Sequence, residues 1–506
     1  MKVAFLTLGC KVNYYETERI KDGFLSAGAE VVPFEECADI YVVNTCTVTN
    51  IADRKSRKML HRARKNNENG LVVACGCYVN SAKVDEVRAQ GVDVCITNDM
   101  KKDAVQIILR EYMEKNPEAK EEGILDKVSQ VKNSYKNTVG LGGETDENSG
   151  KHERTRAYIK VQDGCNQFCT YCIIPYVRGI LRSRSYEDVV GEVTELAKDG
   201  YKEIVVTGIH VSSYGVDFDE YKEFLHKNRD EIKDGLEDGK KKEIYSPYDF
   251  IKLDGKPFLQ LIRRISEIDG IERIRLGSLE PRIITESFVS ELSKIKEVCP
   301  HFHLSLQSGD DETLKRMNRH YSTEDYLEGV RILKKYYEAP AITTDIIVGF
   351  AGETEEEFKN TLHFTEEVGF ADVHVFKYSR RVGTVADKMK NQVDEKIKND
   401  RSARLIEKTE ALKKEYEEEF IGKRVKVLFE EIQEIEGVSC VVGYTDRYVR
   451  VAVKVESILE ILSKKEEDFY DWSELLNFIS KIYQNKMEEV FVEGYLKDGI
   501  MEGKIV

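Results

Sequence analysis

Three cysteines in the middle of the chain have a spacing that suits an iron–sulfur cluster. Cys165, Cys169 and Cys172 form a CxxxCxxC pattern. Three thiolates at this spacing can hold three irons of a [4Fe–4S] cluster and leave the fourth iron open to another ligand. A zinc loop or reduced surface thiols are the alternatives, but zinc favours a fourth Cys or His at close spacing, and none follows here.

A second set of cysteines lies near the N-terminus. Cys10, Cys46 and Cys77 each follow the C-terminal end of a predicted strand. In an open parallel sheet these ends meet at the ligand-binding crevice, so three loops can bring three thiolates together. We predict a second cluster with one open iron, and three buried free cysteines are the alternative. Cys75 is the competing ligand, but it should point into the sheet. The other thiols are predicted to be structural: Cys37, Cys75, Cys95, Cys299 and Cys440.

The N-terminal cysteine set, Cys10, Cys46 and Cys77, lies in residues 1–112, which we predict to be an open parallel α/β domain. Short β-branched runs alternate there with longer helix-like segments, as in such sheets. A linker follows at 113–153, because much of it is rich in Asn, Ser, Gly and acid without any period. The predicted strands are Val3–Leu8, Ile40–Val43, Leu71–Ala74 and Val92–Ile96.

Residues 154–393 repeat a strand–helix alternation that predicts a partial (β/α)6 barrel. The Cys165 loop follows its first strand, at the C-terminal face where barrel active sites sit. A charged, Gly-dotted stretch at 217–256 is predicted to be an insert. The predicted strands are Ala157–Val161, Ile204–Thr207, Arg273–Leu276, Phe302–Leu306, Ile342–Val348 and Val373–Tyr378. The predicted helices are Tyr186–Lys198, Phe258–Ile268, Thr285–Lys296, Thr323–Tyr336 and Glu353–Val368.

The C-terminal part is predicted to be a small β-barrel. A charged helical connector covers 394–420, and residues 421–506 then show mostly short β-patterned runs. A helical stretch, Ile458–Ile482, interrupts them and defines an insert at 456–487. The fold class is therefore α/β, with an open parallel domain, a partial barrel and a small C-terminal β-barrel.

Composition limits the classes of function. Lys and Arg number 77 against 92 Asp and Glu, a net charge of −15, which argues against a generally basic RNA-coating protein and against a polybasic membrane binder. A local basic face is still compatible with this balance. No apolar run reaches the ~18 residues of a membrane helix, and the start of the chain is too short for a signal peptide. We expect a cytoplasmic protein, in which 11 cysteines indicate metal or redox chemistry rather than disulfides.

At the CxxxCxxC loop the chain resembles the radical S-adenosylmethionine (SAM) enzymes. With both cysteine sets considered, it is similar to the methylthiotransferases from Lys2 to the C-terminus. The matching stretches are Thr7–Asn13 (TLGCKVN), Gln162–Cys165 (QDGC), Ser278–Pro281 (SLEP), Leu304–Gly309 (LSLQSG) and Tyr378–Arg380 (YSR). The segment Val442–Val451 resembles the TRAM domain, a small RNA-binding β-barrel.

The resemblance implies an activity. The Gly-Cys-Lys-Val-Asn opening resembles the branch that acts on N6-threonylcarbamoyladenosine of tRNA, next to the anticodon at position 37. One S-adenosylmethionine would methylate a sulfur on the N-terminal cluster, a second would supply a radical, and CH₃–S would enter at C2 of adenine. The isopentenyladenosine branch, the ribosomal-protein branch and a non-catalytic Fe–S RNA-binding protein are the alternatives. Further implied partners are an electron donor such as flavodoxin or ferredoxin and a sulfur source.

Two further groups of residues are predicted to bind ligands. Tyr171 inside the cysteine loop is predicted to contact the cofactor, and Gly208, Gln307 and Gly349, which follow strands, resemble cofactor-lining positions. Glu280, past the third strand, is predicted to be polar lining, with turn or core packing as the alternative for all five. RNA-contacting residues are Arg54, Lys55, Arg57, Lys58, Arg62, Arg64, Lys65, Arg178, Arg182, Arg184, Tyr444, Arg447, Tyr448 and Arg450. Each part of this set has an alternative. The residues between 54 and 65 could belong to an ordinary exposed helix, and the arginines at 178, 182 and 184 could form salt bridges within the barrel. The two tyrosines could pack against their own hairpin.

Overall fold

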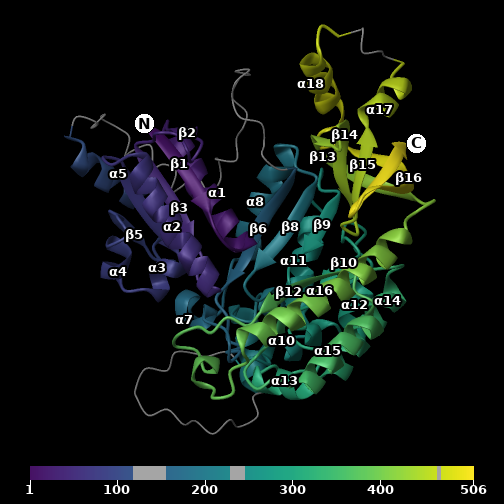
Figure 1. Cartoon of the computed structure of the whole chain (residues 1–506), viewed down its shortest axis with the longest axis horizontal. Helices are drawn as coiled ribbons and strands as arrows, with labels where there is room; N and C mark the ends of the chain where they lie inside the picture. The colour runs from purple at the N-terminus through teal and green to yellow at the C-terminus, as the bar shows by residue number, and fades with distance from the viewer. Residues whose placement is uncertain (118–154, 228–245, 464–468) are drawn as a thin grey trace.

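The computed structural model describes residues 1–117, 155–227, 246–463 and 469–506 (Figure 1). Most of the predicted linker, the centre of the predicted insert at 217–256 and a short part of the insert at 456–487 lie outside these residues. Within the described part of the chain no helix is both long and apolar enough to cross a membrane.

The N-terminal domain is a five-stranded parallel sheet in the order β2-β1-β3-β4-β5. Its central strands are buried along their whole length because helices cover both faces. The short edge strand β2 was not predicted, and α5 runs three residues past the expected boundary at 112. The strands are β1 (Lys2–Thr7), β2 (Glu30–Val32), β3 (Ile40–Thr45), β4 (Leu71–Gly76) and β5 (Val94–Ile96). The helices are α1 (Lys11–Ser26), α2 (Asn50–Asn66), α3 (Cys77–Ser81), α4 (Val84–Arg88) and α5 (Ala104–Lys115), with η1 at Lys101–Asp103.

The central domain is the predicted partial barrel. Its two sheets have the orders β7-β6-β8-β9 and β10-β11-β12, and parallel bridges such as Leu279↔Leu304 link them. The two-residue strand β7 pairs antiparallel with β6. The six parallel strands are β6 (Arg156–Asp163), β8 (Glu203–Gly208), β9 (Arg273–Leu276), β10 (His301–His303), β11 (Ala341–Val348) and β12 (Asp372–Lys377), and β7 is Arg182–Ser183.

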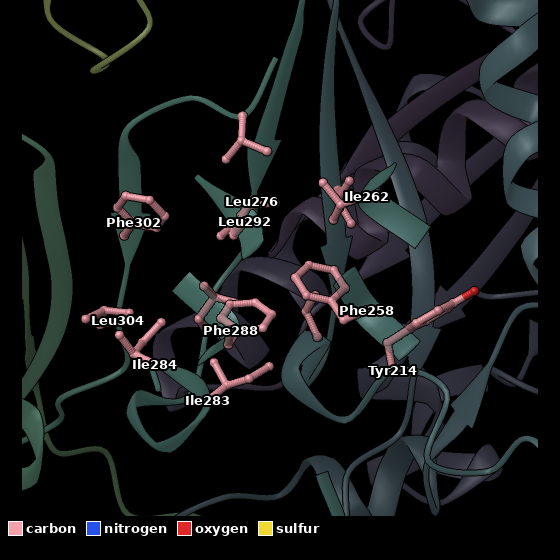
Figure 2. Close-up of a cluster of buried hydrophobic side chains, with 14 of the residues drawn as sticks. Tyr214, Phe258, Ile262, Leu276, Ile283, Ile284, Phe288, Leu292, Phe302 and Leu304 are labelled. Atoms are coloured by element: carbon pink, nitrogen blue, oxygen red, sulfur yellow. The ribbon is translucent and has the colours of Figure 1, made fainter. Parts of the chain in front are cut away.

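Helices cover the outer face of this barrel. Large aromatic side chains such as Phe258 and Phe288 fill the space between strands and helices (Figure 2). The predicted helix Tyr186–Lys198 is α8 and Thr323–Tyr336 is α14, with the same bounds. The other helices are α7 (Ile174–Arg178), α9 (Asp219–Lys227), α10 (Asp249–Lys252), α11 (Lys256–Ser266), α12 (Glu286–Leu292), α13 (Asp311–Arg316) and α15 (Glu355–Val368). The short 3₁₀ turns among the described residues of this domain are η3 (Val211–Ser213), η4 (Pro281–Ile283) and η5 (Ala386–Lys388).

The C-terminal part is a closed five-stranded barrel in the order β13-β14-β15-β17-β16. The connector is the single helix α16 (Glu395–Glu418). The predicted helical stretch in the insert is two helices, α17 (Val455–Ile461) and α18 (Trp472–Tyr483). The strands are β13 (Arg424–Ile435), β14 (Val438–Thr445), β15 (Arg450–Lys454), β16 (Met487–Lys497) and β17 (Ile500–Ile505).

This small barrel closes one end of the central barrel. Arg273 and Arg275 of β9 donate to backbone carbonyls of the C-terminal barrel, including Tyr444 O at 3.0 Å and Asp446 O at 2.9 Å. Arg273, Glu203 and Arg156 lie at the N-terminal ends of their strands. The opposite, C-terminal ends of the strands are therefore the ends that remain for the site.

Candidate active site

The CxxxCxxC loop follows β6 and is held by hydrogen bonds to its own sulfurs. The Gln167 N–H donates to Cys165 Sγ at 3.5 Å, and a guanidinium nitrogen of Arg319 donates to Cys169 Sγ at 3.4 Å. Burial raises the pKa of the Cys165 thiol to about 12 and also raises that of Cys172. Buried neutral thiols with donors aimed at sulfur would become thiolates when a metal centre binds them.

Sequence reasoning did not predict Arg319. Its guanidinium also donates to the Ser305 carbonyl at 3.1 Å and to the hydroxyl of Tyr321 at 2.9 Å. Burial opposes its charge, but the neighbouring tyrosine and Cys169 groups hold its pKa above the usual value. No spacing rule connects this residue with the cysteines, which are about 150 residues earlier in the chain, so only the folded barrel brings them together.

The three N-terminal cysteines come from three neighbouring loops. Cys10 is the N-cap of α1, Cys46 follows β3, and Cys77 is the first residue of α3. Burial, with smaller contributions from the neighbouring Cys77 and Cys10, raises the pKa of Cys46 to about 11. Gly9 allows the Cys10 loop to lie close to Cys46, because a Cβ there would lie 2.9 Å from Cys46 Sγ.

Cys75 takes the orientation expected of a structural thiol. It is fully buried in β4, and its thiol donates to the Val43 carbonyl at 3.7 Å. Cys77 instead accepts a hydrogen bond from the Asn98 amide at 3.9 Å. The same amide nitrogen donates to Val177 O at 2.9 Å, in the helix that follows the CxxxCxxC loop. These contacts support Cys77 as the ligand.

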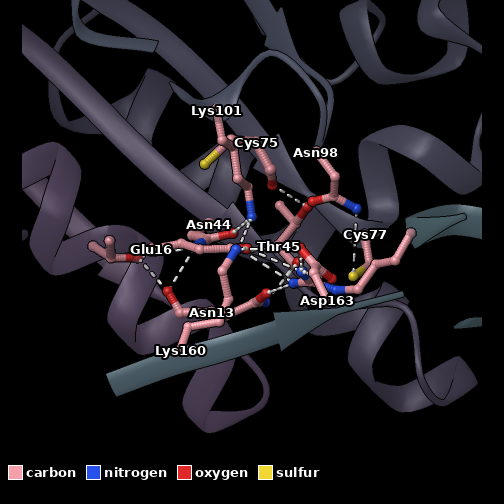
Figure 3. A network of polar contacts seen from close by, with 12 residues as sticks. Asn13, Glu16, Asn44, Thr45, Cys75, Cys77, Asn98, Lys101, Lys160 and Asp163 are labelled. Carbon is pink, nitrogen blue, oxygen red and sulfur yellow. Dashed lines mark hydrogen bonds and ion pairs between the residues drawn. The ribbon is translucent and has the colours of Figure 1, made fainter. Parts of the chain in front are cut away.

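A buried network of charges joins the two cysteine-bearing domains (Figure 3). Glu16 of α1 binds Lys101, Lys160 and Arg178, with Arg178 Nη1 at 2.9 Å and Lys160 Nζ at 2.8 Å. Arg178 also donates to Asn13 at 2.8 Å. Although burial alone would raise the pKa of Glu16, these three cations hold it well below its usual range.

Arg178 and Arg184 are not available to RNA phosphates, which corrects their predicted role. The Arg178 side chain is 0% exposed because Glu16 and Asp163 enclose it. Arg184 pairs with Glu192 at 2.7 Å and donates to the Lys160 carbonyl. The alternative for this set, salt bridges within the barrel, describes the pairs with Asp163 and Glu192, and Arg178 also pairs with Glu16 of the N-terminal domain. Arg182 differs, since its side chain is 52% exposed.

The basic helix α2 has a buried face and a charged face. Thr49 caps it, and Ser56, Leu60 and Ala63 pack against the sheet. Arg54, Lys55, Lys58, Arg62 and Lys65 are exposed, whereas Arg57 is half-buried over the ring of Tyr78. The predicted RNA contact of Arg64 is corrected. Arg64 binds Asp93 and the carbonyls of residues 68, 70 and 91, so its guanidinium makes its contacts inside the domain.

The aromatic and basic residues predicted for the TRAM-like barrel are also used internally. Tyr444 and Tyr448 stack on each other with ring centroids 4.8 Å apart, and Arg156 lies over both rings. Arg447 donates to the carbonyls of residues 338 and 339, and Arg450 donates to Gln433. These contacts attach the small barrel to the central one or act within it, while Tyr448 is still 38% exposed, so the RNA role of these four residues stays a prediction.

Two of the five predicted cofactor-lining positions, Gly208 and Gly349, lie at strand ends of the barrel, whereas Tyr171, Glu280 and Gln307 lie in the loops that follow strands, and the ligand role of all five stays a prediction. Glu280 is 3% exposed and pairs with Arg282, while its Oε2 has no hydrogen-bond partner among the described residues. Gln307 has a left-handed φ of 72°, and strained backbone of this kind clusters at functional sites. Tyr171 packs edge-to-face on Phe350. Gly208 lies against Gln162, and a Cβ at Gly349 would collide with Lys398.

Comparisons with known proteins bear on this arrangement. Residues 159–365 match the Radical SAM superfamily, and residues 2–97 match the Uncharacterized protein family UPF0004. The threonylcarbamoyladenosine tRNA methylthiotransferase MtaB of Bacillus subtilis (strain 168) is 39% identical over 453 residues, covering 89% of this chain and 90% of that protein.

The chain belongs to the radical SAM methylthiotransferase family. A second family member, MtaB of Aquifex aeolicus, is 35% identical, covering 85% of this chain and 92% of that protein. The tRNA-2-methylthio-N(6)-dimethylallyladenosine synthase of Alkaliphilus oremlandii is 33% identical, covering 85% and 82%. Among solved structures the chain is similar to TsrM, a radical S-adenosylmethionine methyltransferase from Kitasatospora setae, with 14% identity, a TM-score of 0.46 and 75% of each chain covered.

Membership in the radical SAM methylthiotransferase family implies a [4Fe–4S] cluster and S-adenosylmethionine. The CxxxCxxC loop fits such a cluster, because it supplies three thiols and hydrogen-bond donors point at the sulfurs of Cys165 and Cys169.

Proposed function

We propose that this chain is a tRNA methylthiotransferase that inserts a methylthio group at C2 of N6-threonylcarbamoyladenosine, next to the anticodon at position 37. It uses two S-adenosylmethionine per turnover, one as methyl donor and one as radical source. The observation that carries the proposal is that the Asn98 amide donates both to Cys77 and to Val177, in the helix after the CxxxCxxC loop, in a chain that is 39% identical to a threonylcarbamoyladenosine tRNA methylthiotransferase.

Each triad has a separate role in the proposal. Cys165, Cys169 and Cys172 hold the radical cluster, and Cys10, Cys46 and Cys77 hold an auxiliary cluster that presents the sulfur. When bound, the two clusters and S-adenosylmethionine supply a carbon radical and a methylated sulfur. The chain itself holds both loops in place: Arg319 and the Gln167 N–H donate to the first set of sulfurs, and Asn98 orients Cys77.

The unpaired oxygen of Glu280 supports a cofactor pocket next to the radical loop. Buried polar atoms in native structures have hydrogen-bond partners, so an orphaned carboxylate oxygen in the loop after a strand calls for a ligand or water. Burial raises the pKa of Glu280, and a bound cationic or hydrogen-bonding group would offset that cost. We assign this pocket to S-adenosylmethionine, with Tyr171, Gly208, Gln307 and Gly349 near it.

The exposed cations of α2 form the proposed tRNA surface. The helix begins four residues after Cys46, so its first turn adjoins the auxiliary site. Its N-terminus is fixed against the central domain, because Arg381 binds Asp53 at 2.8 Å. Phosphates of the anticodon arm that contact Arg54, Lys55 and Lys58 would therefore lie close to both cysteine sets. An external electron donor of the flavodoxin or ferredoxin type and a sulfur source complete the reaction.

Dimethylallyladenosine of tRNA is the second candidate substrate, because a synthase for its methylthio derivative is 33% identical to this chain. Mass spectrometry of tRNA nucleosides from cells without the gene separates the two. We expect loss of 2-methylthio-N6-threonylcarbamoyladenosine, restored by the wild-type gene but not by Cys46→Ala. Loss of the dimethylallyl derivative instead would favour the second substrate, and unchanged levels of both, in a strain without a paralogous gene, would contradict the proposal.

A further inference from the structure

An exposed aromatic pair lies at the CxxxCxxC loop. Tyr176 of α7 is 57% exposed, and Phe168, inside the loop, is 44% exposed. Their ring centroids are 6.2 Å apart with the ring planes at 80°, which is an edge-to-face contact. Such a contact covers one face of one ring, so the other ring faces of the pair are free of it. Single exposed aromatic residues are ordinary, but two that pack on each other and stay exposed indicate a binding surface.

The backbone holds this pair in place. Phe168 has a left-handed φ of 50°, a conformation that costs energy for a residue with a Cβ and that clusters at functional sites. The Asn318 amide donates to the Phe168 carbonyl at 3.1 Å and so fixes the strained residue. The helix α7 is anchored next to Tyr176 by Val177, whose side chain is buried and whose carbonyl accepts from Asn98 at 2.9 Å. A ring that is already fixed loses little freedom when a ligand binds on it.

The helix α7 lies next to both cysteine sets. It begins two residues after Cys172, the last cysteine of the CxxxCxxC loop. It also packs against α3, the helix that begins at Cys77 (Figure 1). The Asn98 amide that holds Val177 donates to Cys77 Sγ at 3.9 Å. Tyr176 is therefore an exposed ring on an element that contacts the surroundings of both triads.

The helix α3 connects this pair to the proposed tRNA surface on α2. Arg57 of α2 lies over the ring of Tyr78 in α3, 5.9 Å from its centroid. The hydroxyls of Thr47, in the loop before α2, and Ser81 of α3 are 3.0 Å apart. Arg182, in the short strand after α7, adds a cation that is 52% exposed. Exposed aromatic rings and exposed cations on neighbouring elements are the combination that binds single-stranded RNA.

We propose that Tyr176, with Phe168 packed on it, stacks an unpaired base of the anticodon loop next to the target adenine. The inference rests on the proposed function. Bases of a loop can leave their stack and expose a ring face, and proteins bind such bases on aromatic side chains. The target adenine must itself reach the space between the two triads to react, so an adjacent base is the one left for a solvent-facing ring on α7.

The electron donor is the competing partner for an exposed apolar pair next to the radical loop. A protein partner needs an interface of many residues on each side, whereas one or two rings match a single base. The connection to the basic helix through α3 also favours RNA. The experiment therefore measures RNA binding and reduction of the cluster separately.

The test is a binding cycle over enzyme and RNA. The enzymes are the holoenzyme and its Tyr176→Leu, Tyr176→Phe and Tyr470→Leu variants. Leucine removes the ring and keeps an apolar side chain, phenylalanine keeps the ring, and Tyr470 is a matched tyrosine, 95% exposed, in the C-terminal domain. Phe168 is left unchanged because it adjoins Cys169. The RNAs are the anticodon stem-loop with N6-threonylcarbamoyladenosine and two versions that lack the base at position 36 or at position 38.

We expect Tyr176→Leu to weaken binding of the complete stem-loop by about 5- to 100-fold, because one base loses its stacking partner. Tyr176→Phe and Tyr470→Leu should bind within about twofold of wild type. One of the two abasic RNAs should bind wild type more weakly by a similar factor, and should lose no further affinity with Tyr176→Leu. Iron content, and 5′-deoxyadenosine formation without RNA, should be equal in all four enzymes.

Several outcomes would overturn the inference. Unchanged binding by Tyr176→Leu, or an equal loss on all three RNAs, would show that no neighbouring base stacks on this ring. Slower reduction of the cluster by flavodoxin with unchanged RNA binding would assign the pair to the electron donor. If Tyr176→Leu loses iron, wild type alone decides, since equal binding of the complete and both abasic RNAs excludes a stacked neighbour. A holoenzyme that neither binds nor methylthiolates the complete stem-loop would contradict the proposed function itself, which the other outcomes leave intact.

Discussion

At the scale of single residues, the site depends on thiols whose surroundings oppose ionisation until a metal centre binds. Burial raises the pKa of Cys46 to about 11 and of Cys165 to about 12. Metal binding must therefore displace protons from these thiols. Backbone and side-chain donors at Cys165, Cys169 and Cys77 then stabilise the sulfur charge.

Removing one auxiliary thiol separates the two proposed clusters. We expect Cys10→Ala to lower iron from about eight to about four per chain, and to keep S-adenosylmethionine cleavage while losing methylthio insertion. Iron and sulfide counting, together with assays of 5′-deoxyadenosine and modified RNA, measure this. The control is Cys75→Ala, which should keep its iron and lose only about 1 kcal/mol of stability. Normal methylthiolation by Cys10→Ala would refute the auxiliary-cluster assignment.

The cysteine sets could be predicted from sequence because their spacing and their place after strands are local features. The roles of Arg178, Tyr444 and Tyr448 could not, because their partners are distant in the chain. Arg178 binds Glu16 across 162 positions, and Arg275, over the Tyr448 ring, belongs to another domain. The local sequence around a basic or aromatic residue does not indicate a partner that lies far away in the chain.

At the scale of elements, α2 shows how one helix can separate packing from binding. Its small and apolar residues recur at helical spacing toward the sheet, so that most of its cations face outward. The position of its first turn next to Cys46 follows from the short connection after β3. The element therefore couples the proposed RNA surface directly to the auxiliary site.

Two basic residues of α2 should behave in opposite ways. We expect Lys58→Ala to weaken tRNA binding and to reduce the salt dependence of binding by about one unit of slope, with unchanged stability. Arg64→Ala should cost about 1–3 kcal/mol of stability, because Asp93 and several carbonyls lose their donor, and should leave the salt slope unchanged. Binding titrations at several salt concentrations and thermal unfolding of the holoenzyme check both. A salt slope that responds to Arg64→Ala and not to Lys58→Ala would contradict the proposed RNA surface.

Most helices and strands could be predicted, and the exceptions have physical causes. The helix bounds of α8 and α14 follow from Ser caps and a regular apolar period. The predicted strand Phe302–Leu306 is regular only over His301–His303, because the chain then turns through isolated bridges to the left-handed Gln307. Backbone that bends toward a site in this way has no periodic signal.

At the scale of the whole molecule, a buried network fixes the two cysteine-bearing domains to each other. Glu16 follows Cys10 by six residues, and Arg178 follows Cys172 by six, so their ion pair ties the helices next to both cysteine sets. The electrostatic influence of Cys77 on Arg178 shows that this tie lies near the auxiliary site. The distance between the two proposed clusters therefore depends on this contact.

Breaking the network should destabilise the junction. We expect Glu16→Gln to cost about 3–5 kcal/mol, because three buried cations lose their anion. Since the folded pKa of Glu16 is depressed, its contribution is present above the unfolded pKa of about 4.3 and is lost as pH falls through the folded value. Calorimetry should thus show that acidification destabilises wild type more than the variant. Glu114→Gln, at an exposed site on α5, is the control, and equal stability of both variants would contradict the role of the network.

The global composition was a poor guide to the partner. The net charge of −15 gave no indication of a polyanionic substrate, because the basic residues that we propose to bind it are concentrated on one helix. The order of the domains could be predicted from alternating patterns. Their relative placement could not, because it rests on contacts such as Arg381 with Asp53, which are 328 residues apart.

The reaction of the purified holoenzyme with one RNA shows whether the chain methylthiolates N6-threonylcarbamoyladenosine. An anticodon stem-loop that contains this nucleoside is incubated with the reduced enzyme and S-adenosylmethionine, and its nucleosides are analysed by mass spectrometry. We expect adenine to gain CH₃–S in place of the C2 hydrogen, with 5′-deoxyadenosine and S-adenosylhomocysteine formed alongside. A fully loaded enzyme that cleaves S-adenosylmethionine but leaves this nucleoside unchanged would contradict the proposed function.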